Sequence, residues 1–279
     1  MNFLKASFIK TVGILIALIW ATSFSSARDL TNITYDTDYD LFYQDQFHIL
    51  YPKVRELVPL AYETVLKQWG LKDTGGLNYP LTVQIKKIES HTLQRWEAAY
   101  VQAQGDGQSL RQSLVLDIGS YMQNPQEDIT LIITHEMAHV ILRDNLTGPD
   151  VAPIPSWFNE GLAQSVTHEG SQRVKSDVAR LRQQEYSTGH LLFCDLDGPV
   201  DEFAHGAYNG GCYPVFYLAV KRLEQLGGPQ TLRRVILGLR NGTPMRDLVR
   251  SITRLDWPSF QRDLETYTNR IFDGSVPVP

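Results

Sequence analysis

The chain reads His135-Glu136-Met137-Ala138-His139 within a largely apolar run, and this stretch decides the fold that we expect. On a helix, residues four positions apart lie about 40° apart in projection, so His135 and His139 present two imidazoles to one cation. Glu136 lies beside them, where its carboxylate can take a proton from a metal-bound water. The alternative is a core helix with two incidental histidines, whose burial without a metal would be costly.

The residues around this motif predict a buried helix. Asn124 is the expected N-cap, with Pro125 at the first helical position and Glu127 at the third. An apolar run follows over residues 129–142, and Gly148 lies beyond the expected end of the helix.

A hydrolytic zinc site needs three protein ligands and one open position. Residues 155–163 read Pro-Ser-Trp-Phe-Asn-Glu-Gly-Leu-Ala, and Ser156 is the expected N-cap of a second helix that runs to about His168. The 20 residues between His139 and Glu160 allow a turn and a returning antiparallel helix, so Glu160 is the expected third ligand. A solvated carboxylate is the alternative role for Glu160, and His168 and Glu169 are the alternative ligands.

The rest of the chain predicts an α+β fold. Residues 47–51, 81–88 and 113–118 read as strands, and residues 54–69 have a helical period that stops at Gly70. Residues 104–109 read as a mobile loop or a hairpin turn, and everything after residue 121 looks helical. We therefore expect a small N-terminal α/β lobe over residues 28–120 and a helical lobe over residues 121–279, with the zinc cleft between them.

The two motifs together resemble those of the gluzincin metallopeptidases, which bind zinc through two histidines and a glutamate. The likeness is greatest to the peptidase-MA-like group, which includes the zinc aminopeptidases and leukotriene A4 hydrolase. It extends to residues 207–211, 215–218 and 227–229, and covers roughly residues 47–272. The resemblance implies a zincin-like two-lobed domain, a zinc cofactor and hydrolysis of peptide bonds.

The resemblance also implies how a substrate is handled. In this family a tyrosine that opens such a segment hydrogen-bonds the oxyanion of the tetrahedral intermediate, and Tyr208 stands at that position. A phenol is a suitable donor, although any of the 13 tyrosines can serve in packing and His205 is the competing candidate. The family's last strand before the metal helix pairs with extended substrate, so residues 114–118 are expected to form the edge of the cleft. The Gly-x-Met-Glu-Asn segment of zinc aminopeptidases is absent, which favours an endopeptidase.

The first 27 residues read as a signal peptide. Lys5 and Lys10 form a positive region, residues 11–21 are uncharged and rich in Ile and Leu, and small residues at positions 25 and 27 suit cleavage after Ala27. The 17 uncharged residues 11–27 are short for a membrane span, so we expect no stable span after cleavage, with an uncleaved anchor as the alternative. The mature chain is expected in the periplasm or the medium.

The net charge and the cysteines limit which partners and covalent links we expect. Loss of Lys5 and Lys10 changes the net charge from −5 to −7, and no basic cluster is present, so nucleic acid and anionic membranes are not expected partners. A peptide or protein substrate is expected, and the sequence does not indicate an oligomeric state. Cys194 and Cys212 bracket the segment around Tyr208 and suit a disulfide in an oxidising compartment, with two buried thiols as the alternative.

These observations predict an exported zinc metallopeptidase with His135, His139 and Glu160 on the metal and with Glu136 and Tyr208 as catalytic residues. Because every ligand and the general base are present, an enzyme is favoured over a zincin-fold binding or assembly factor of the cell envelope. A hydrolase of non-peptide substrates is a third option, since a fold does not dictate its substrate.

Overall fold

The computed structural model of the chain describes residues 30, 32–37, 44–72, 76–86, 99–105, 110–117, 128–167, 171, 174–175, 196 and 213–279. The described strands are β1 (Ile33–Thr37), β2 (Leu81–Lys86), β3 (Ala99–Gln104) and β4 (Arg111–Asp117). The described helices are α2 (Gln44–Trp69), α4 (Ile129–Asn145), α5 (Ser156–Thr167), α7 (Tyr213–Gly227), α8 (Thr231–Arg240), α9 (Met245–Thr253) and α10 (Trp257–Phe272). The expected mixture of helix and sheet is confirmed.

The strands form one sheet in the order β1-β2-β4-β3. β1, β2 and β4 run parallel, and β3 runs antiparallel to β4, with Gln104 opposite Arg111. Leu81, Val83 and Ile85 alternate along β2 and are fully buried, which confirms the half-buried strand expected there. Residues 104–111 therefore connect two antiparallel neighbours, as the hairpin reading of the loop requires.

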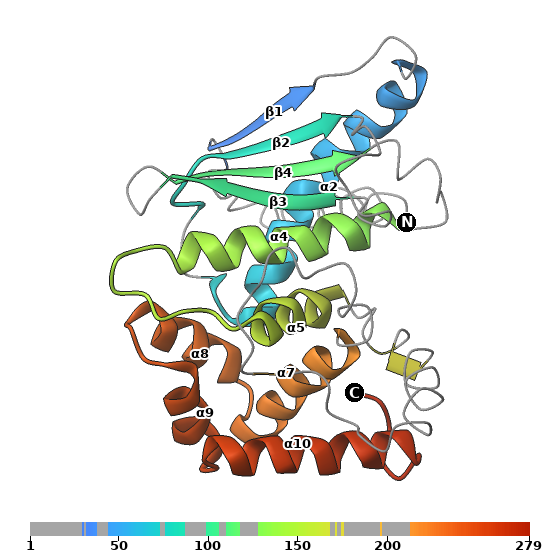
Figure 1. The fold of residues 1–279 in the computed structure, drawn as a ribbon. Coiled ribbons are helices and arrows are strands. Elements are labelled where there is room, and N and C mark those ends of the chain that lie inside the picture. The colour runs from blue at the N-terminus through green and yellow to red at the C-terminus, as the bar shows by residue number, and fades with distance from the viewer. Residues whose placement is uncertain are drawn as a thin grey trace, which may run out of the picture.

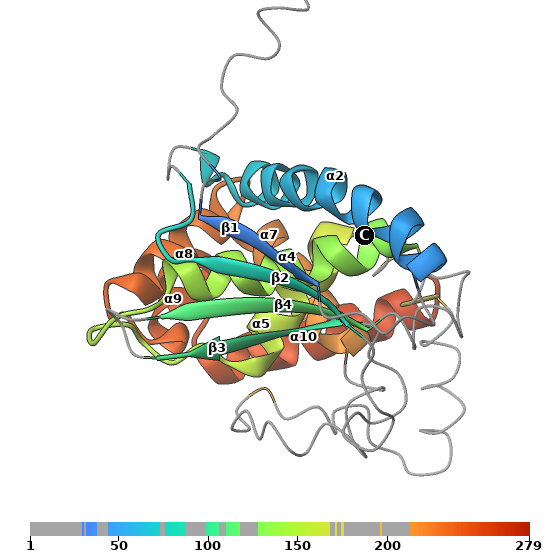
Figure 2. The same cartoon turned by 90° about the horizontal axis from the view of Figure 1, so that it is seen from above.

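The edge of the sheet differs from the expectation. Residues 114–117 belong to β4, which already pairs with β2 and β3, so the prediction that residues 114–118 pair with substrate at the edge of the cleft is wrong for the part described. Among the described strands, β3 is the edge on that side, and it lies at the margin opposite α2 (Figure 2). β4 is buried from Leu114 to Asp117 because it has a neighbouring strand on each side.

The first helix also corrects an expectation. Residues 47–51 do not form a strand that ends at Pro52, because α2 begins at Gln44 and continues to Trp69. Leu50, Val54 and Val58 are buried at a spacing of four residues, whereas the Ile49 side chain is 77% exposed. This is burial with a helical period rather than alternation. The predicted helical stretch 54–69 is confirmed, and the chain leaves it at Gly70 with φ +69°.

The elements stack in layers with α4 in the middle. The sheet lies on one side of α4, and α5, α7 and α10 follow in turn on its other side (Figure 1). One hydrophobic cluster runs through these layers, and its members on α4 include Ile133, Met137, Val140 and Ile141. A helix that is buried on both sides in this way has its position fixed by packing. No helix in the described ranges has the length and apolar character that crossing a membrane requires.

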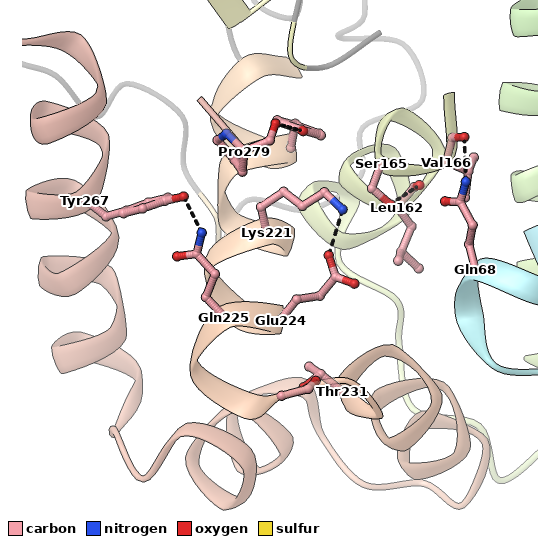
Figure 3. A network of polar contacts seen from close by, with 12 residues as sticks. Gln68, Leu162, Ser165, Val166, Lys221, Glu224, Gln225, Thr231, Tyr267 and Pro279 are labelled. Atoms are coloured by element: carbon pink, nitrogen blue, oxygen red, sulfur yellow. Dashed lines mark hydrogen bonds and ion pairs between the residues drawn. The ribbon is translucent and has the colours of Figure 1, made fainter. Parts of the chain in front are cut away.

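Polar contacts connect the helices of the lower layers (Figure 3). The Gln68 side chain of α2 donates to the carbonyl oxygen of Val166 in α5 at 3.1 Å. The Gln225 amide of α7 donates to the Tyr267 hydroxyl of α10 at 2.8 Å, and the nearby Arg222 guanidinium binds both carboxylate oxygens of Asp263. Because α7 also packs against α5, these contacts join α10 to the helix that carries Glu160.

Candidate metal centre

The helix that carries His135 and His139 begins later than expected. Asp128 is the N-cap of α4, and its side chain accepts a hydrogen bond from the Thr130 amide at 2.9 Å. The prediction of Asn124 as the N-cap is therefore wrong, and Asn124, Pro125 and Glu127 lie outside the described residues. An aspartate at this position satisfies an unpaired amide of the first turn and carries a charge that the helix dipole favours.

The other end of α4 is held by a buried carboxylate. Asp144 is 5% exposed, and it accepts hydrogen bonds from the backbone amide and side chain of Asn78 and from the backbone amide of Tyr79. Burial raises the pKa of Asp144, and the bonds from Asn78 and Tyr79 oppose that shift. These contacts fix the C-terminal turn of α4 to the segment that leads into β2, so α4 is restrained at both ends.

The second motif forms α5, which packs closely against α7. The Pro155 carbonyl accepts hydrogen bonds from the amides of Phe158 and Asn159, so Ser156 is the first helical residue rather than the N-cap. A Cβ atom on Gly161 would lie 2.4 Å from the carbonyl oxygen of Phe216, which shows how near the two backbones approach. Glycine at this position therefore allows α5 to pack this close to α7, and this packing sets the position of Glu160 one residue earlier.

The structure brings His135, His139 and Glu160 together. The two histidine Nε2 atoms are 3.3 Å apart, and Glu160 Oε2 lies 3.8 Å from His135 Nε2 and 3.7 Å from His139 Nε2. The carboxylate is thus too far from either imidazole for a direct hydrogen bond. A circle through the three atoms has a radius of about 2.1 Å, which equals the usual length of a bond from zinc to histidine or carboxylate. Within the described residues, these three side chains form a group that could hold a metal ion.

Asn159 also supports a metal site here, although no role for it was predicted from the sequence. Its Oδ1 lies 2.9 Å from Nδ1 of His139. An amide oxygen only accepts, so His139 Nδ1 carries the proton and a neutral ring leaves the lone pair on Nε2. That lone pair faces Nε2 of His135 and the Glu160 carboxylate, so the three donor atoms favour a cation between them. The signal in the sequence is an amide directly before the third ligand.

The three donor side chains are partly exposed. The side chains of His135, His139 and Glu160 are 23%, 11% and 16% exposed, so solvent reaches a site whose walls are mostly buried. Glu136 follows His135 on α4 and is also partly exposed. A centre of this kind has three protein donors, exposure to water and a second carboxylate, Glu136, next to a ligand in the sequence.

Several predicted residues lie outside the part of the chain that the structure describes. They are the signal peptide 1–27, His168, Glu169, Cys194, His205, Tyr208 and Cys212. The roles predicted for them therefore stay predictions.

Comparison with known proteins adds no relative. No protein-family model, curated protein or solved structure matches the chain.

Proposed function

We propose that this chain is an exported zinc metallopeptidase of the gluzincin type, with a zincin-like two-lobed domain, that cleaves peptide bonds within a chain. The observation that carries the proposal is the spacing of the three donor atoms of His135, His139 and Glu160, which all lie about 2.1 Å from one common point. Two imidazoles and one carboxylate are a donor set typical of catalytic zinc, which leaves a position for water.

The residues around the centre have distinct tasks in this proposal. Zinc at such a site lowers the pKa of water and polarises a carbonyl group. Glu136 accepts the proton of the attacking water, since it follows a ligand on the same helix and is not in the donor group. Asn159 holds the His139 ring in the tautomer that presents Nε2. Tyr208 donates a hydrogen bond to the developing oxyanion, as the family resemblance implies.

The sheet supplies a place for an extended substrate. β3 is an edge among the described strands, and it packs against α4, the helix that carries two of the ligands. An extended peptide can add to such an edge through backbone hydrogen bonds, which depend little on sequence. This mode of binding holds the middle of a chain and does not require a free end, in keeping with an endopeptidase.

The test uses the mature chain and its Glu136→Gln variant. Metal analysis should give about one zinc per chain for both proteins, because Glu136 is not a ligand. The unaltered chain should cleave a mixed peptide library, lose this activity to a chelator and regain it with zinc, whereas Glu136→Gln should lose nearly all cleavage. Glu265→Gln on the distant helix α10 is the matched control and should cleave normally.

Two results would contradict the proposal. A Glu136→Gln protein that cleaves at the full rate would remove Glu136 as the general base. Full zinc occupancy with no cleavage of any peptide would instead favour the alternative, a zincin-fold binding or assembly factor of the cell envelope.

A further inference from the structure

A cationic side chain lies one helical turn beyond the metal centre. Arg143 follows His139 by four residues on α4, so it projects from nearly the same side of the helix. Its Nη1 donates to the backbone carbonyl of Val101 in the edge strand β3, at a long 3.4 Å. The side chain is partly exposed. Arg143 thus reaches from the metal helix to the strand at which we place the substrate.

The Arg143 guanidinium has further N–H donors that could bind a ligand. A guanidinium carries five N–H donors, and among the described residues its hydrogen bond to the Val101 carbonyl uses one of them. No ion pair joins it to a carboxylate among the described residues. The adjacent carboxylate, Asp144, is buried and bound to Asn78 and Tyr79. A charged fork of this kind matches a carboxylate better than it matches a single carbonyl oxygen.

The position of Arg143 sets which part of a bound peptide it would meet. Four residues along a helix advance about 6 Å, and an extended peptide advances about 3.3 Å per residue. Arg143 is therefore about two peptide residues away from the metal centre. In a peptide added to β3, side chains alternate between the two faces of the sheet, and those on the face of Val101 point toward α4.

We propose that Arg143 determines specificity by binding the carboxylate of an Asp or Glu side chain about two residues from the cleaved bond. This proposal rests on the proposed function, because it assumes that peptide lies between β3 and the metal centre. It assigns the chain a preference for acidic peptide segments. The preference is separate from catalysis, since Arg143 is not in the donor group of the metal.

The experiment measures binding rather than cleavage. The zinc-loaded Glu136→Gln chain is titrated with fluorescent decapeptides that carry one Glu, Gln or Lys at successive positions. At one position Glu should bind about tenfold more tightly than Gln, the effect of a charge-assisted hydrogen bond. Adding Arg143→Met should remove this difference, Arg143→Lys should keep part of it, and Arg143→Glu should favour the Lys peptide. Arg262→Glu, the same charge change at an exposed position of α10, should leave the Glu preference intact.

A structural role for Arg143 would give a different pattern. If Arg143 only fastens α4 to β3, Arg143→Met weakens all peptides equally or lowers the melting temperature without changing the preference, and the proposal is overturned. Equal binding of the Glu and Gln peptides at every position to the chain with Arg143 intact also overturns it, even if Arg143→Glu does not fold. Cleavage of the same peptides by the chain with Glu136 tests the proposed function separately, since Arg143-dependent binding without cleavage refutes only the peptidase.

Discussion

Replacing Gly161 with alanine tests whether the packing of α5 against α7 positions the third metal ligand. Gly161 follows Glu160 directly, and a Cβ there would lie 2.4 Å from the carbonyl oxygen of Phe216 and 2.7 Å from Cγ2 of Val220. The first of these atoms belongs to the backbone of α7 and cannot turn aside. α5 must therefore move away from α7 in the variant.

The size of the movement follows from the contact distances. Real Cβ contacts are essentially never shorter than 3.0 Å, so α5 must move by about 0.6 Å or more. Metal–ligand distances tolerate about 0.2 Å, so the movement carries Glu160 out of range of the point that it shares with the two histidines. We expect the affinity for zinc to fall about 10- to 100-fold, as it does when the support of a ligand is removed. Overpacking costs about 1–3 kcal/mol, and the higher helix propensity of alanine offsets about 1 kcal/mol of it.

The assay is competition for zinc against a chelator of known affinity, together with thermal unfolding of the metal-free protein. Gly238→Ala on α8 is the control, because its Cβ would lie 2.3 Å from Cδ2 of Leu248. Leu248 is far from the three metal ligands in the sequence. The control should lower stability less than Gly161→Ala does, because the Leu248 side chain can turn aside, and it should leave zinc affinity unchanged. If Gly161→Ala binds zinc as tightly as the unaltered chain, the contact with α7 does not position Glu160 and the reasoning fails.

Two further changes have defined outcomes. Asn159→Ala removes the acceptor that orients His139, so zinc affinity should fall about 10- to 100-fold while the melting temperature of the metal-free chain changes little. Asn269→Ala on α10 is the control. Equal zinc affinities for the two variants would refute the role of Asn159. Hydrogen bonds from the side chain and backbone of Ser259 hold the pKa of Asp256, the N-cap of α10, below its usual 3.8. A lowered carboxyl pKa stabilises the fold above pH 3.8 and ceases to do so as the pH falls through the lower value. Asp256→Ala should therefore lower the melting temperature at neutral pH and lower it by less at a pH well below 3.8, and a difference of the same size in acid would contradict this account.

Local geometry explains which parts of the site the sequence could predict. The spacing of His135 and His139 brings two imidazoles together on any helix, so it needs no knowledge of the fold. Glu160 required one further step, a returning helix of the right length. The role of Asn159 depends on how α5 is rotated relative to α4, and that rotation is decided by packing against α7. The spacing of residues in the sequence does not predict this rotation.

The wrong predictions of secondary structure also come from packing that the sequence does not show. Residues 47–51 are apolar enough for a strand, but their assignment as helix depends on which side chains the sheet and α4 cover, and only Leu50 is well buried among those described. β3 was not predicted, because Tyr100, Gln102 and Gln104 give a weak strand pattern and pairing with β4 decides its state. Strands that depend on partners distant in sequence are the hardest to infer from one chain.

The restraint of α4 at both ends bears on the order in which the protein matures. Asp128 caps its first turn, Asp144 holds its last, and the apolar side chains between them pack in the hydrophobic core. Small zinc domains that fold only around their metal lack such a core. Under the proposed function, an exported chain with such a core can fold first and acquire its ion after it leaves the cytoplasm. The same proposal then implies that the supply of zinc in the destination compartment, rather than in the cytoplasm, sets how much of the protein carries its metal.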